Sequence, residues 1–371
     1  MARGGPTLPL YVGGFIGPFG GAVLSVLIPQ LRDDFGASTA EVAVAIPAYL
    51  VPFALLQLVS GTIGERLGRR RVVRYGYIAY AVFSLLAAVA PSIELFIGTR
   101  ALQGASNAFL TPLLLAGLAE VVAPERLGRS VGTFAAVQTA AIAFSPLLGG
   151  LLGEVDWRLA FVAPGIAAAA LAFFPPEEGE LRDADAAPAR LRAVMTPRVG
   201  WLSLAAFAGY AGITGLGFLV ALVAADDFGL GSIERGAVVA GFGFAGMIVG
   251  RAAGGLVDSF GRVRMAVTGA ALTGGVIAAI GFSESTLLLT ILWTTAGLTS
   301  TLVWTGLNTL AIEAVPGNRA GATSVFSAFK FAGNAAAPLM WLPLYAIDVR
   351  FAFLGAGLLA ASVAAISLKL R

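Results

Sequence analysis

The sequence predicts an all-α membrane protein with twelve transmembrane helices in two pseudo-symmetric six-helix bundles. Three observations lead to this fold class. The 371-residue chain is 58% hydrophobic and only 12% charged, and that charged fraction is about half the value of a typical soluble domain. Apolar segments long enough to cross a bilayer follow one another along the chain. One loop motif also occurs twice, 193 positions apart, which is typical of membrane proteins built from two like halves.

Both copies of the repeated motif begin with glycine, followed by an acid four residues later, glycine at seven and arginine at eight. The first copy, with its adjoining arginines, comprises Gly61, Glu65, Arg66, Gly68, Arg69 and Arg70. The second copy comprises Gly254, Asp258, Gly261 and Arg262. Pro146 and Pro338 repeat at nearly the same offset, 192 positions. We therefore expect the working site to lie between two like halves.

A transmembrane helix needs about 20 apolar residues, and charged or Pro/Gly-rich segments separate twelve such spans in order along the chain. In the first half these spans are 8–31, 42–63, 72–91, 93–122, 130–153 and 158–174. In the second half they are 199–225, 235–257, 265–283, 286–314, 321–346 and 350–368. The predicted bundles are therefore residues 1–174 and 199–371, and the charged segment 175–198 is the predicted cytoplasmic linker.

The basic residues assign the two sides of the membrane, because Lys and Arg are enriched in cytoplasmic loops. Of the 24 basic residues, 17 fall on one side of the predicted spans, 4 on the other and 3 within spans. The sequence thus predicts a multi-pass protein of the cell (plasma) membrane with both termini cytoplasmic. We expect neither a cleaved signal nor an appended soluble domain.

The composition also excludes several kinds of chemistry. The chain contains neither cysteine nor histidine, which excludes disulfides, thiol nucleophiles, histidine acid/base chemistry and Cys/His zinc sites. No pairing of a nucleophile with a base is visible, so we expect no enzymatic activity, no metal and no cofactor. The net charge of +3 reflects arginines that anchor loops, and it does not indicate nucleic-acid binding.

Residues 61–71 resemble the loop 2–3 signature of the major facilitator superfamily, and this resemblance covers essentially the whole chain. It implies a transporter that works by alternating access, with helices 1, 4, 7 and 10 lining a cavity. It also implies that the two motif copies latch the halves together on the cytoplasmic side. Gly61 and Gly254 would allow close helix approach, while Glu65 and Asp258 would pair with loop arginines or cap a helix N-terminus. The alternative is that these residues only anchor the topology.

Two further segments are similar to drug:proton antiporters of this family. Residues 100–104, which include Arg100 and Gln103, match the helix 4 motif. The fifth span follows the spacing of the antiporter motif with Gly132, Ser145, Pro146, Gly149 and Gly150. Tyr49 and Gln57 stand where drug-efflux members commonly have them, whereas the acid that many such antiporters carry in helix 1 is missing.

The fourth span carries a polar stripe on one helical face, formed by Arg100, Gln103, Asn107 and Thr111. Lipid disfavours such a face, so we expect it to face protein or a water-filled cavity. Arg100 would then sense substrate or help proton transfer. Alternatively, it reaches the interface or bonds to backbone carbonyls of the first helix.

The eleventh span places Lys330 near the midplane, with Asn334 on the same face. A charge at that depth is costly and usually functional. Lys330 would carry a proton between states or, if it stays charged, bind an anionic group; the alternative is that it extends to the cytoplasmic interface. The family resemblance adds Tyr210, Trp304 and Asn308 as candidate cavity residues, with ordinary helix packing as their alternative role.

Proton-coupled export of small amphipathic molecules is the predicted function. The expected partners are a small-molecule substrate, protons and the lipid bilayer, without nucleic acid, and the expected state is a monomer. The alternative is uptake, exchange or facilitated diffusion of an anionic solute such as an organic acid, because Arg100 and Lys330 lack evident acidic partners in the membrane. No Asp or Glu lies clearly at a midplane, so the sequence supplies no central acidic proton site.

Overall fold

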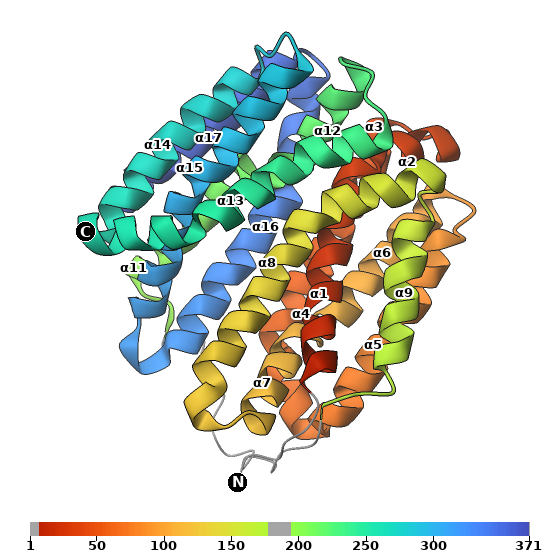
Figure 1. Ribbon diagram of the computed structural model, residues 1–371, viewed down its shortest axis with the longest axis vertical. Coiled ribbons are helices and arrows are strands. Elements are labelled where there is room, and N and C mark those ends of the chain that lie inside the picture. Colours follow the sequence, from red (N-terminus) through yellow and green to blue (C-terminus); the bar gives the residue numbers. More distant parts are fainter. Residues whose placement is uncertain (1–6, 177–193, 371) are drawn as a thin grey trace. The chain divides into compact units, whose positions relative to one another are not determined.

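The computed structural model describes residues 7–176 and 194–370, and every regular element within them is a helix (Figure 1). The predicted all-helical fold is thus confirmed for this part of the chain. Here, each of the twelve predicted spans coincides with one helix or with consecutive helices. The described residues form two compact units, one before and one after residues 177–193. Most of the predicted linker 175–198 lies outside the described residues.

The N-terminal unit is built from the first nine α-helices and one 3-10 helix. In order these are α1 (Leu8–Ala22), η1 (Val23–Val26), α2 (Ile28–Phe35), α3 (Thr39–Ala43), α4 (Ala45–Leu67), α5 (Arg69–Ala88), α6 (Ile93–Asn107), α7 (Thr111–Val121), α8 (Pro124–Val155) and α9 (Leu159–Leu171). Side chains satisfy the free backbone N–H groups where two of these helices begin. Ser38 and Glu41 form a capping box on α3, and Ser92 accepts from the backbone N–H of Leu95 on α6.

The C-terminal unit contains the remaining elements. They are α11 (Pro197–Gly212), η2 (Thr214–Leu216), α12 (Gly217–Asp226), α13 (Ser232–Phe260), α14 (Arg262–Ile280), α15 (Thr286–Glu313), η3 (Pro316–Asn318), α16 (Arg319–Tyr345) and α17 (Val349–Leu368). Thr196, Ser285, Asn318 and Asp348 cap α11, α15, α16 and α17 respectively with side-chain oxygens. The positions that begin these helices therefore carry the residue types that local chemistry favours.

Nine helical segments within the described residues are long and apolar enough to cross a membrane. Three predicted spans, at 72–91, 158–174 and 321–346, are helical but lie outside this set. The corresponding α9 is apolar but has only 13 residues, and α5 begins with three consecutive arginines. The third, α16, carries Lys330 and two prolines within its length. The chain is therefore a multi-pass membrane protein.

Four of the predicted spans are interrupted rather than continuous, and one of them, at 42–63, crosses the break between α3 and α4 at residue 44. The span at 8–31 changes to the 3-10 helix η1, the span at 199–225 changes to η2, and the span at 93–122 breaks at residues 108–110. The last break corrects the predicted polar stripe. Arg100, Gln103 and Asn107 lie buried on α6, but Thr111 begins α7 and is only partly buried. The stripe is therefore confined to three residues of one helix.

The repeated motif forms a tight helix-to-helix turn in each unit. Gly68 joins α4 to α5 with φ 88°, and Gly261 joins α13 to α14 with φ 92°, a conformation that glycine adopts without steric cost. The motif's first glycines have no close neighbour inside their own unit. Within the described residues, no atom lies within 4 Å of the position that a Cβ would take on Gly61 or Gly254. The expected close helix approach at these two glycines is therefore not present inside either unit.

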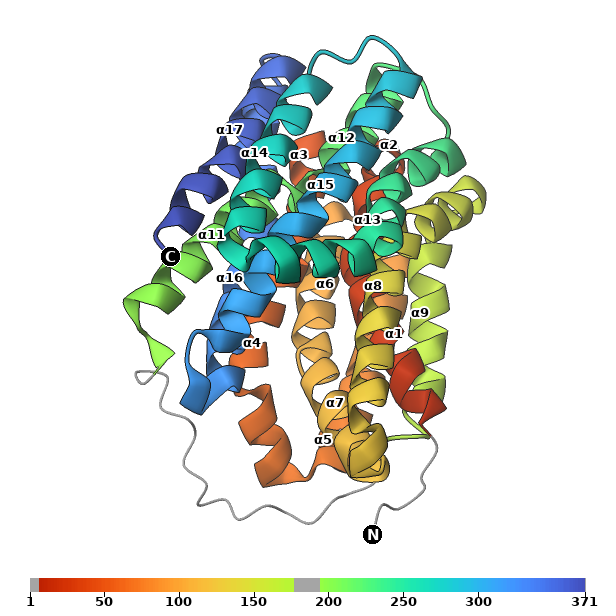
Figure 2. The same cartoon turned by 60° about the vertical axis from the view of Figure 1, so that its left-hand side comes forward.

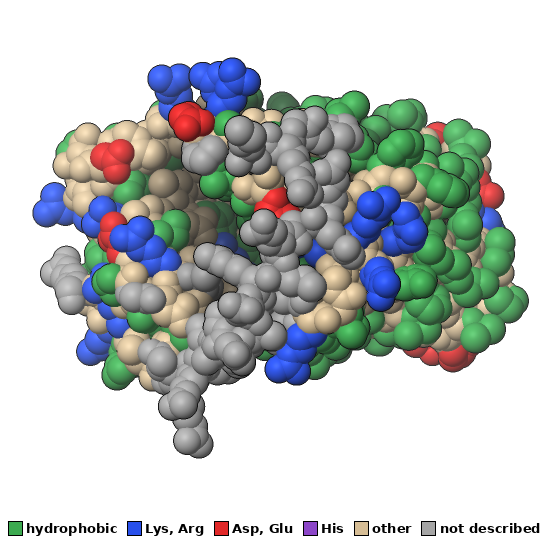
Figure 3. Space-filling model, turned by 90° about the horizontal axis from the view of Figure 1, so that it is seen from below, with side chains coloured by type: hydrophobic (Ala, Val, Ile, Leu, Met, Phe, Trp, Pro, Cys, Tyr) green, Lys and Arg blue, Asp and Glu red, His purple; other side chains and the backbone are tan. Residues whose placement is uncertain are grey.

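Basic side chains gather on the face seen in Figure 3, where blue Lys and Arg surfaces stand among green hydrophobic ones. Within the N-terminal unit, an ion pair between Arg69 and Glu120 joins the α4–α5 turn to the end of α7. At the other end of this unit, Arg158 contacts Asp34 at 2.8 Å. Five of the 17 basic residues assigned to the predicted cytoplasmic side lie outside the described residues: Arg3, Arg182, Arg190, Arg192 and Arg371.

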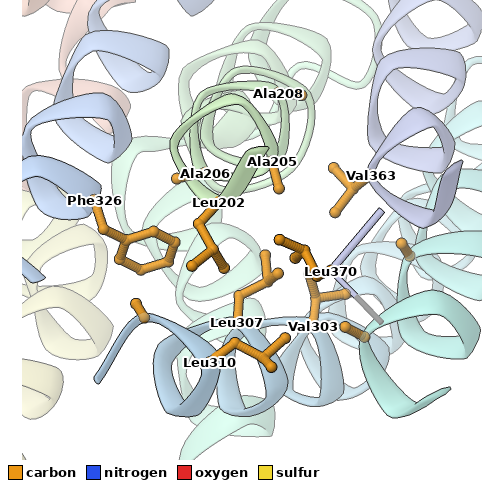
Figure 4. Packing of buried hydrophobic residues seen from close by; sticks show 13 residues of the cluster. Leu202, Ala205, Ala206, Ala208, Val303, Leu307, Leu310, Phe326, Val363 and Leu370 are labelled. Atoms are coloured by element: carbon orange, nitrogen blue, oxygen red, sulfur yellow. The ribbon is translucent and has the colours of Figure 1, made fainter. Parts of the chain in front are cut away.

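The core of the C-terminal unit lies between α11, α14, α15, α16 and α17. In both ribbon views α14 runs beside α15 and α17, and it packs against both helices (Figures 1 and 2). Figure 4 shows how α11 contributes Leu202 and Ala205 to this core, opposite Leu307 of α15 and beside Phe326 of α16. Small residues allow these helices to approach closely. The core therefore holds α11, α15 and α16 in fixed register at the candidate site described below.

Candidate functional site

Arg100 on α6 is the central cation of the N-terminal unit. Its side chain is fully buried. Its Nη2 donates a hydrogen bond to the backbone carbonyl of Gly20 on α1 at 2.9 Å, and its Nη1 donates to Oε1 of Gln103 one turn away. Of the alternatives considered for this residue, bonding to a carbonyl of the first helix is therefore the one observed. A buried ion of this kind is stable only when such partners replace its hydration shell.

Gln103 extends this contact across the bundle. Its Nε2 donates to Oγ of Ser84 on α5 at 2.9 Å, and Ser84 Oγ in turn donates to the carbonyl of Phe161 on α9 at 2.8 Å. One chain of hydrogen bonds therefore links α1, α6, α5 and α9. Ser84 and Phe161 are absent from the sequence-based candidates, because only the tertiary structure brings α5 and α9 to α6.

Aromatic rings enclose the guanidinium of Arg100. Its Cζ lies 4.4 Å from the centroid of the Tyr49 ring on α4 and 5.4 Å from that of Phe161, within the range of cation–π attraction. The Tyr49 hydroxyl donates to the carbonyl of Gly17 at 3.2 Å. Gly104, the glycine of the helix 4 motif, has a clear role here, since a Cβ at this position would clash with the Tyr49 carbonyl oxygen. Only glycine lets α4 and α6 pack at this distance.

The glycines of α1 admit polar side chains from neighbouring helices. A Cβ on Gly17 would meet the amide of Asn107, and one on Gly20 would meet the Tyr80 hydroxyl. Asn107 is 2% exposed, and its Oδ1 has no hydrogen-bond partner among the described residues. In this region α1 therefore supplies carbonyl oxygens rather than a carboxylate, consistent with the missing helix 1 acid.

Gln57 is not brought into this cluster. It lies on α4 two turns beyond Tyr49 and is partly buried, and its backbone carbonyl accepts a hydrogen bond from Ser60. Within the described residues, no side-chain bond from Gln57 to Arg100 is recorded. The sequence motif therefore contributes unequally, because Tyr49 contacts the cation whereas Gln57 does not.

The helix 5 motif packs α8 against the interrupted first helix. Ser145 donates from Oγ to the carbonyl of Phe19 at 3.0 Å, and a Cβ on Gly149 would lie 2.8 Å from Val23 of η1. Pro146 stands inside α8 beside this contact, and Gly150 is buried. Gly132 instead faces open space within the described residues. The second half of the motif therefore holds α8 close to η1.

The C-terminal unit brings Lys330 to the residues that the resemblance indicated. Nζ of Lys330 on α16 donates to Oδ1 of Asn308 on α15 at 2.7 Å. Three ring centroids surround the ammonium, at 4.6 Å for Phe326, 5.6 Å for Tyr210 and 5.8 Å for Trp304. Asn308 lies five residues before the end of α15, about 8 Å along the helix. The ammonium is therefore held by this amide rather than extending past the helix end.

Small residues shape the surroundings of Lys330. The ring centroids of Tyr210 and Trp304 lie 4.7 Å apart in an edge-on arrangement, which is a favoured geometry for aromatic pairs. A Cβ on Gly209 would lie 2.7 Å from the Trp304 ring, so glycine makes room for it. Asn334, one turn beyond Lys330, lies against Gly215, which belongs to η2. Side chains of α11, α15 and α16 therefore meet around one ammonium.

The motif arginines form equivalent ion pairs in the two units. Arg69 contacts Glu120 at 2.6 Å, and Arg262 contacts Glu313 at 2.7 Å. Both residues of the second pair lie 193 positions after those of the first. Neither glutamate was predicted to be a partner, although this shared offset was a signal that could have found them. The pairs are partly exposed, and in water such pairs contribute about 0–1 kcal/mol.

The acids of the repeated loop motif and the arginines beside them have fewer recorded contacts in the described residues. Asp258, Arg66 and Arg70 are exposed, and the Glu65 side chain lies outside the part of the structure that is described. Among the described residues, Asp258 has no recorded ion pair with the loop arginines. In each unit the motif arginine pairs with a glutamate at a helix end, and pairing of the motif acid Glu65 stays a prediction.

The model of the Major Facilitator Superfamily matches residues 10–338 of the chain. "Multidrug efflux pump LfrA" of Mycolicibacterium smegmatis is 35% identical over 169 residues, covering 45% of this chain and 34% of that protein. "Puromycin resistance protein pur8" of Streptomyces alboniger is 34% identical over 140 residues, covering 37% of this chain and 28% of that protein. The matched segments thus span about a third of these relatives' length.

Solved transporter structures share the fold over nearly the whole chain. An inward-facing, occupied bacterial homolog of the human lysosomal transporter Spinster has a TM-score of 0.80 at 17% identity, covering 98% of this chain and 96% of that one. The inward-open xylose transporter XylE from E. coli has a TM-score of 0.74 at 16% identity, covering 98% and 95% respectively. At these identities the likeness concerns the fold alone.

Proposed function

The chain belongs to the Major Facilitator Superfamily and is a multi-pass membrane transporter of a small molecule, and from this premise we propose that it exports small amphipathic molecules in exchange for protons. Relatives named as multidrug efflux and antibiotic-resistance proteins support the direction of transport. The helix 4 and helix 5 segments, which resemble those of drug:proton antiporters, support proton exchange.

The buried Arg100 cluster is the observation that carries this proposal. Its guanidinium is bound to a carbonyl of α1 only three residues before that helix changes to η1. A local rearrangement of α1 would therefore break the bond to Gly20 and free a charged donor. The Nε of Arg100 has no hydrogen-bond partner among the described residues. That donor would hold a water molecule or a substrate group and so help proton transfer.

Acidic side chains set a limit on how protons are exchanged. Every Asp and Glu among the described residues lies in a loop or within about one turn of a helix end. The proposed coupling therefore does not depend on a carboxylate midway along a helix. It depends on the contacts of Arg100 with α1, α4 and Gln103, which are made in one state and broken in another.

The two Arg–Glu pairs fit a proposed latch in an alternating-access cycle. Each pair ties its own motif turn to the end of α7 or α15. In each unit the ion pair would keep the motif turn rigid, so that the turn moves as one body when the transporter changes state.

We further propose that both termini are cytoplasmic, in the cell membrane, because the basic residues favour one side of the predicted spans by 17 to 4. A monomer is the proposed state.

A pH gradient tests the proposal directly. Purified protein in liposomes should accumulate a cationic or neutral amphipathic dye when a proton gradient is imposed, and collapse of the gradient should release the dye. Arg100→Gln should abolish accumulation. Arg251→Gln should retain it, since Arg251 is an exposed arginine on α13. Dye movement that ignores the proton gradient in the wild-type protein would overturn the proposal.

A further inference from the structure

We propose that Lys330, Asn308 and the surrounding aromatic rings form a subsite that binds the carboxylate of an amphipathic organic acid. This inference rests on the proposed export function and names one class among its substrates. It places a specific anion site in the C-terminal unit, on α11, α15 and α16. Charge balance, free donors and the shape of this site support it.

Within the described part of its own unit, no acidic side chain is recorded as a partner of the Lys330 ammonium. The partners of its ammonium are an amide oxygen and three aromatic rings, all of them uncharged. In the described part of the C-terminal unit, the acids lie in loops or within about one turn of a helix end: Asp226, Asp227, Glu234, Asp258, Glu284, Glu313 and Asp348. Glu313 already pairs with Arg262. An uncompensated charge within a membrane is costly, so an anionic ligand would stabilise this site.

The ammonium also has donors to spare. A lysine ammonium has three N–H donors, and the structure records one hydrogen bond, to Asn308 Oδ1. Because Oδ1 is the atom that accepts, the amide's own N–H₂ is available as a donor beside Nζ. A carboxylate can therefore accept from Lys330 with one oxygen and from Asn308 with the other. Charge-assisted hydrogen bonds of this kind are stronger than neutral ones.

The aromatic rings are fixed in position before a ligand binds. Phe326 belongs to the buried core that also contains Leu202 and Leu307 (Figure 4). The Trp304 ring lies over Gly209 and against Tyr210. A preformed site avoids the entropy cost of ordering side chains upon binding. The rings therefore favour an acid with an aromatic or apolar body over a small, strongly hydrated anion.

Exchange of an anion for a proton is also favourable electrically. An anion that leaves the cell and a proton that enters both move in the direction that an inside-negative membrane potential drives. A Lys330 side chain that stays charged returns to its starting position in each transport cycle, so its own charge does not cancel the electrical driving force on the anion and the proton. The subsite is thus compatible with the proposed antiport.

Matched ligands test the subsite. The purified protein is titrated with 1-naphthylacetate and with 1-naphthylacetamide, which share one aromatic body and differ in charge. The wild-type protein should bind the acid at least tenfold more tightly than the amide. Lys330→Gln should remove this preference by weakening acid binding at least tenfold, and a cooperative thermal unfolding transition of the variant shows that it is folded. Lys369→Gln, which alters the chain's only other lysine, should behave like the wild type.

Three results would overturn the inference. The first is equal affinity of the wild-type protein for both ligands, and the second is acid binding that survives in Lys330→Gln. The third concerns the source of the anion, because a phospholipid headgroup offers similar chemistry. If acid binding is strong in phosphatidylcholine nanodiscs but disappears when phosphatidylglycerol is included, the site belongs to lipid rather than to substrate.

Transport distinguishes this inference from the proposed function. In the transport assay, Lys330→Gln should lose acid export, whereas Lys369→Gln should retain both acid export and proton-linked dye export. Absence of proton-linked dye export in the wild-type protein, with acid binding intact, would contradict the export proposal but not the subsite. Normal dye export without any preference for the acid would contradict the subsite but not the export proposal.

Discussion

Replacement of Gln103 by leucine tests whether the Arg100 network holds the N-terminal unit together. Gln103 is fully buried and forms two recorded side-chain hydrogen bonds, one with Arg100 and one with Ser84. Leucine has a similar volume but can replace neither bond. Gln103→Leu therefore leaves a buried guanidinium donor and a buried hydroxyl with fewer partners, with little change in packing.

The expected loss follows from these two bonds. A hydrogen bond to a charged group contributes about 1.5–3 kcal/mol, and a neutral one contributes about 0.5–1.5 kcal/mol. The Ser84 hydroxyl keeps its bond to the Phe161 carbonyl, so most of the lost stability comes from the bond to Arg100. We expect Gln103→Leu to lower the free energy of unfolding by about 2–4 kcal/mol. For a cooperative unit of this size, that corresponds to a fall in Tm of roughly 5–12 °C.

Thermal unfolding of the purified protein in detergent provides the assay. Gln57→Leu is the matched control, because Gln57 is partly buried in the same unit and its side chain has no recorded bond to the cluster within the described residues. It should change Tm by no more than about 1–2 °C. The double variant Gln103→Leu/Ser84→Ala should be less destabilised than the sum of the single variants, since both residues share one network. Equal Tm values for the Gln103 and Gln57 variants would refute this reasoning.

Three further substitutions probe other parts of the structure. Gly104→Ala should lower Tm by the equivalent of at least about 1–3 kcal/mol, because its Cβ would meet the Tyr49 carbonyl, whereas Gly98→Ala, which faces open space, should not. Glu120→Gln breaks the partly exposed pair with Arg69, so it should change stability by about 1 kcal/mol or less but slow transport several-fold in the dye assay. Burial and a neighbouring aspartate raise the pKa of Asp227, so its ionised form destabilises the fold as pH rises. Asp227→Asn should therefore raise Tm slightly at neutral pH and lose that advantage below the ordinary carboxyl pKa of about 4.

Much of the fold was predictable because lipid imposes strong constraints on composition and length. The spans and the helix turns at Gly68 and Gly261 follow directly from apolar segments and repeated glycines. The interruptions were harder to predict, since an apolar segment reads alike whether it is straight or broken. Pro29 and Pro112 were the available signals, because each stands near the start of the helix that follows a break.

The sites were predictable by residue but not by contact. Periodicity placed Arg100 and Gln103 on one face, yet the chain could not indicate that Gly20 supplies the carbonyl. That partner depends on the packing of α1 against α6, which lie 80 residues apart at this contact. In the same way, the position of Lys330 in its span predicted a functional cation. Its aromatic surroundings come from α11 and α15 as well as α16, so they emerge only from tertiary packing.

Substrate-driven proton movement tests the central claim most directly. Protein is placed in liposomes that contain a pH dye, and an outward or inward gradient of a cationic or neutral amphiphile is imposed without any initial pH difference. Antiport predicts that protons move opposite to the substrate in the wild-type protein and that this movement is lost in Arg100→Gln. Substrate transport without proton movement in the wild-type protein would contradict the account.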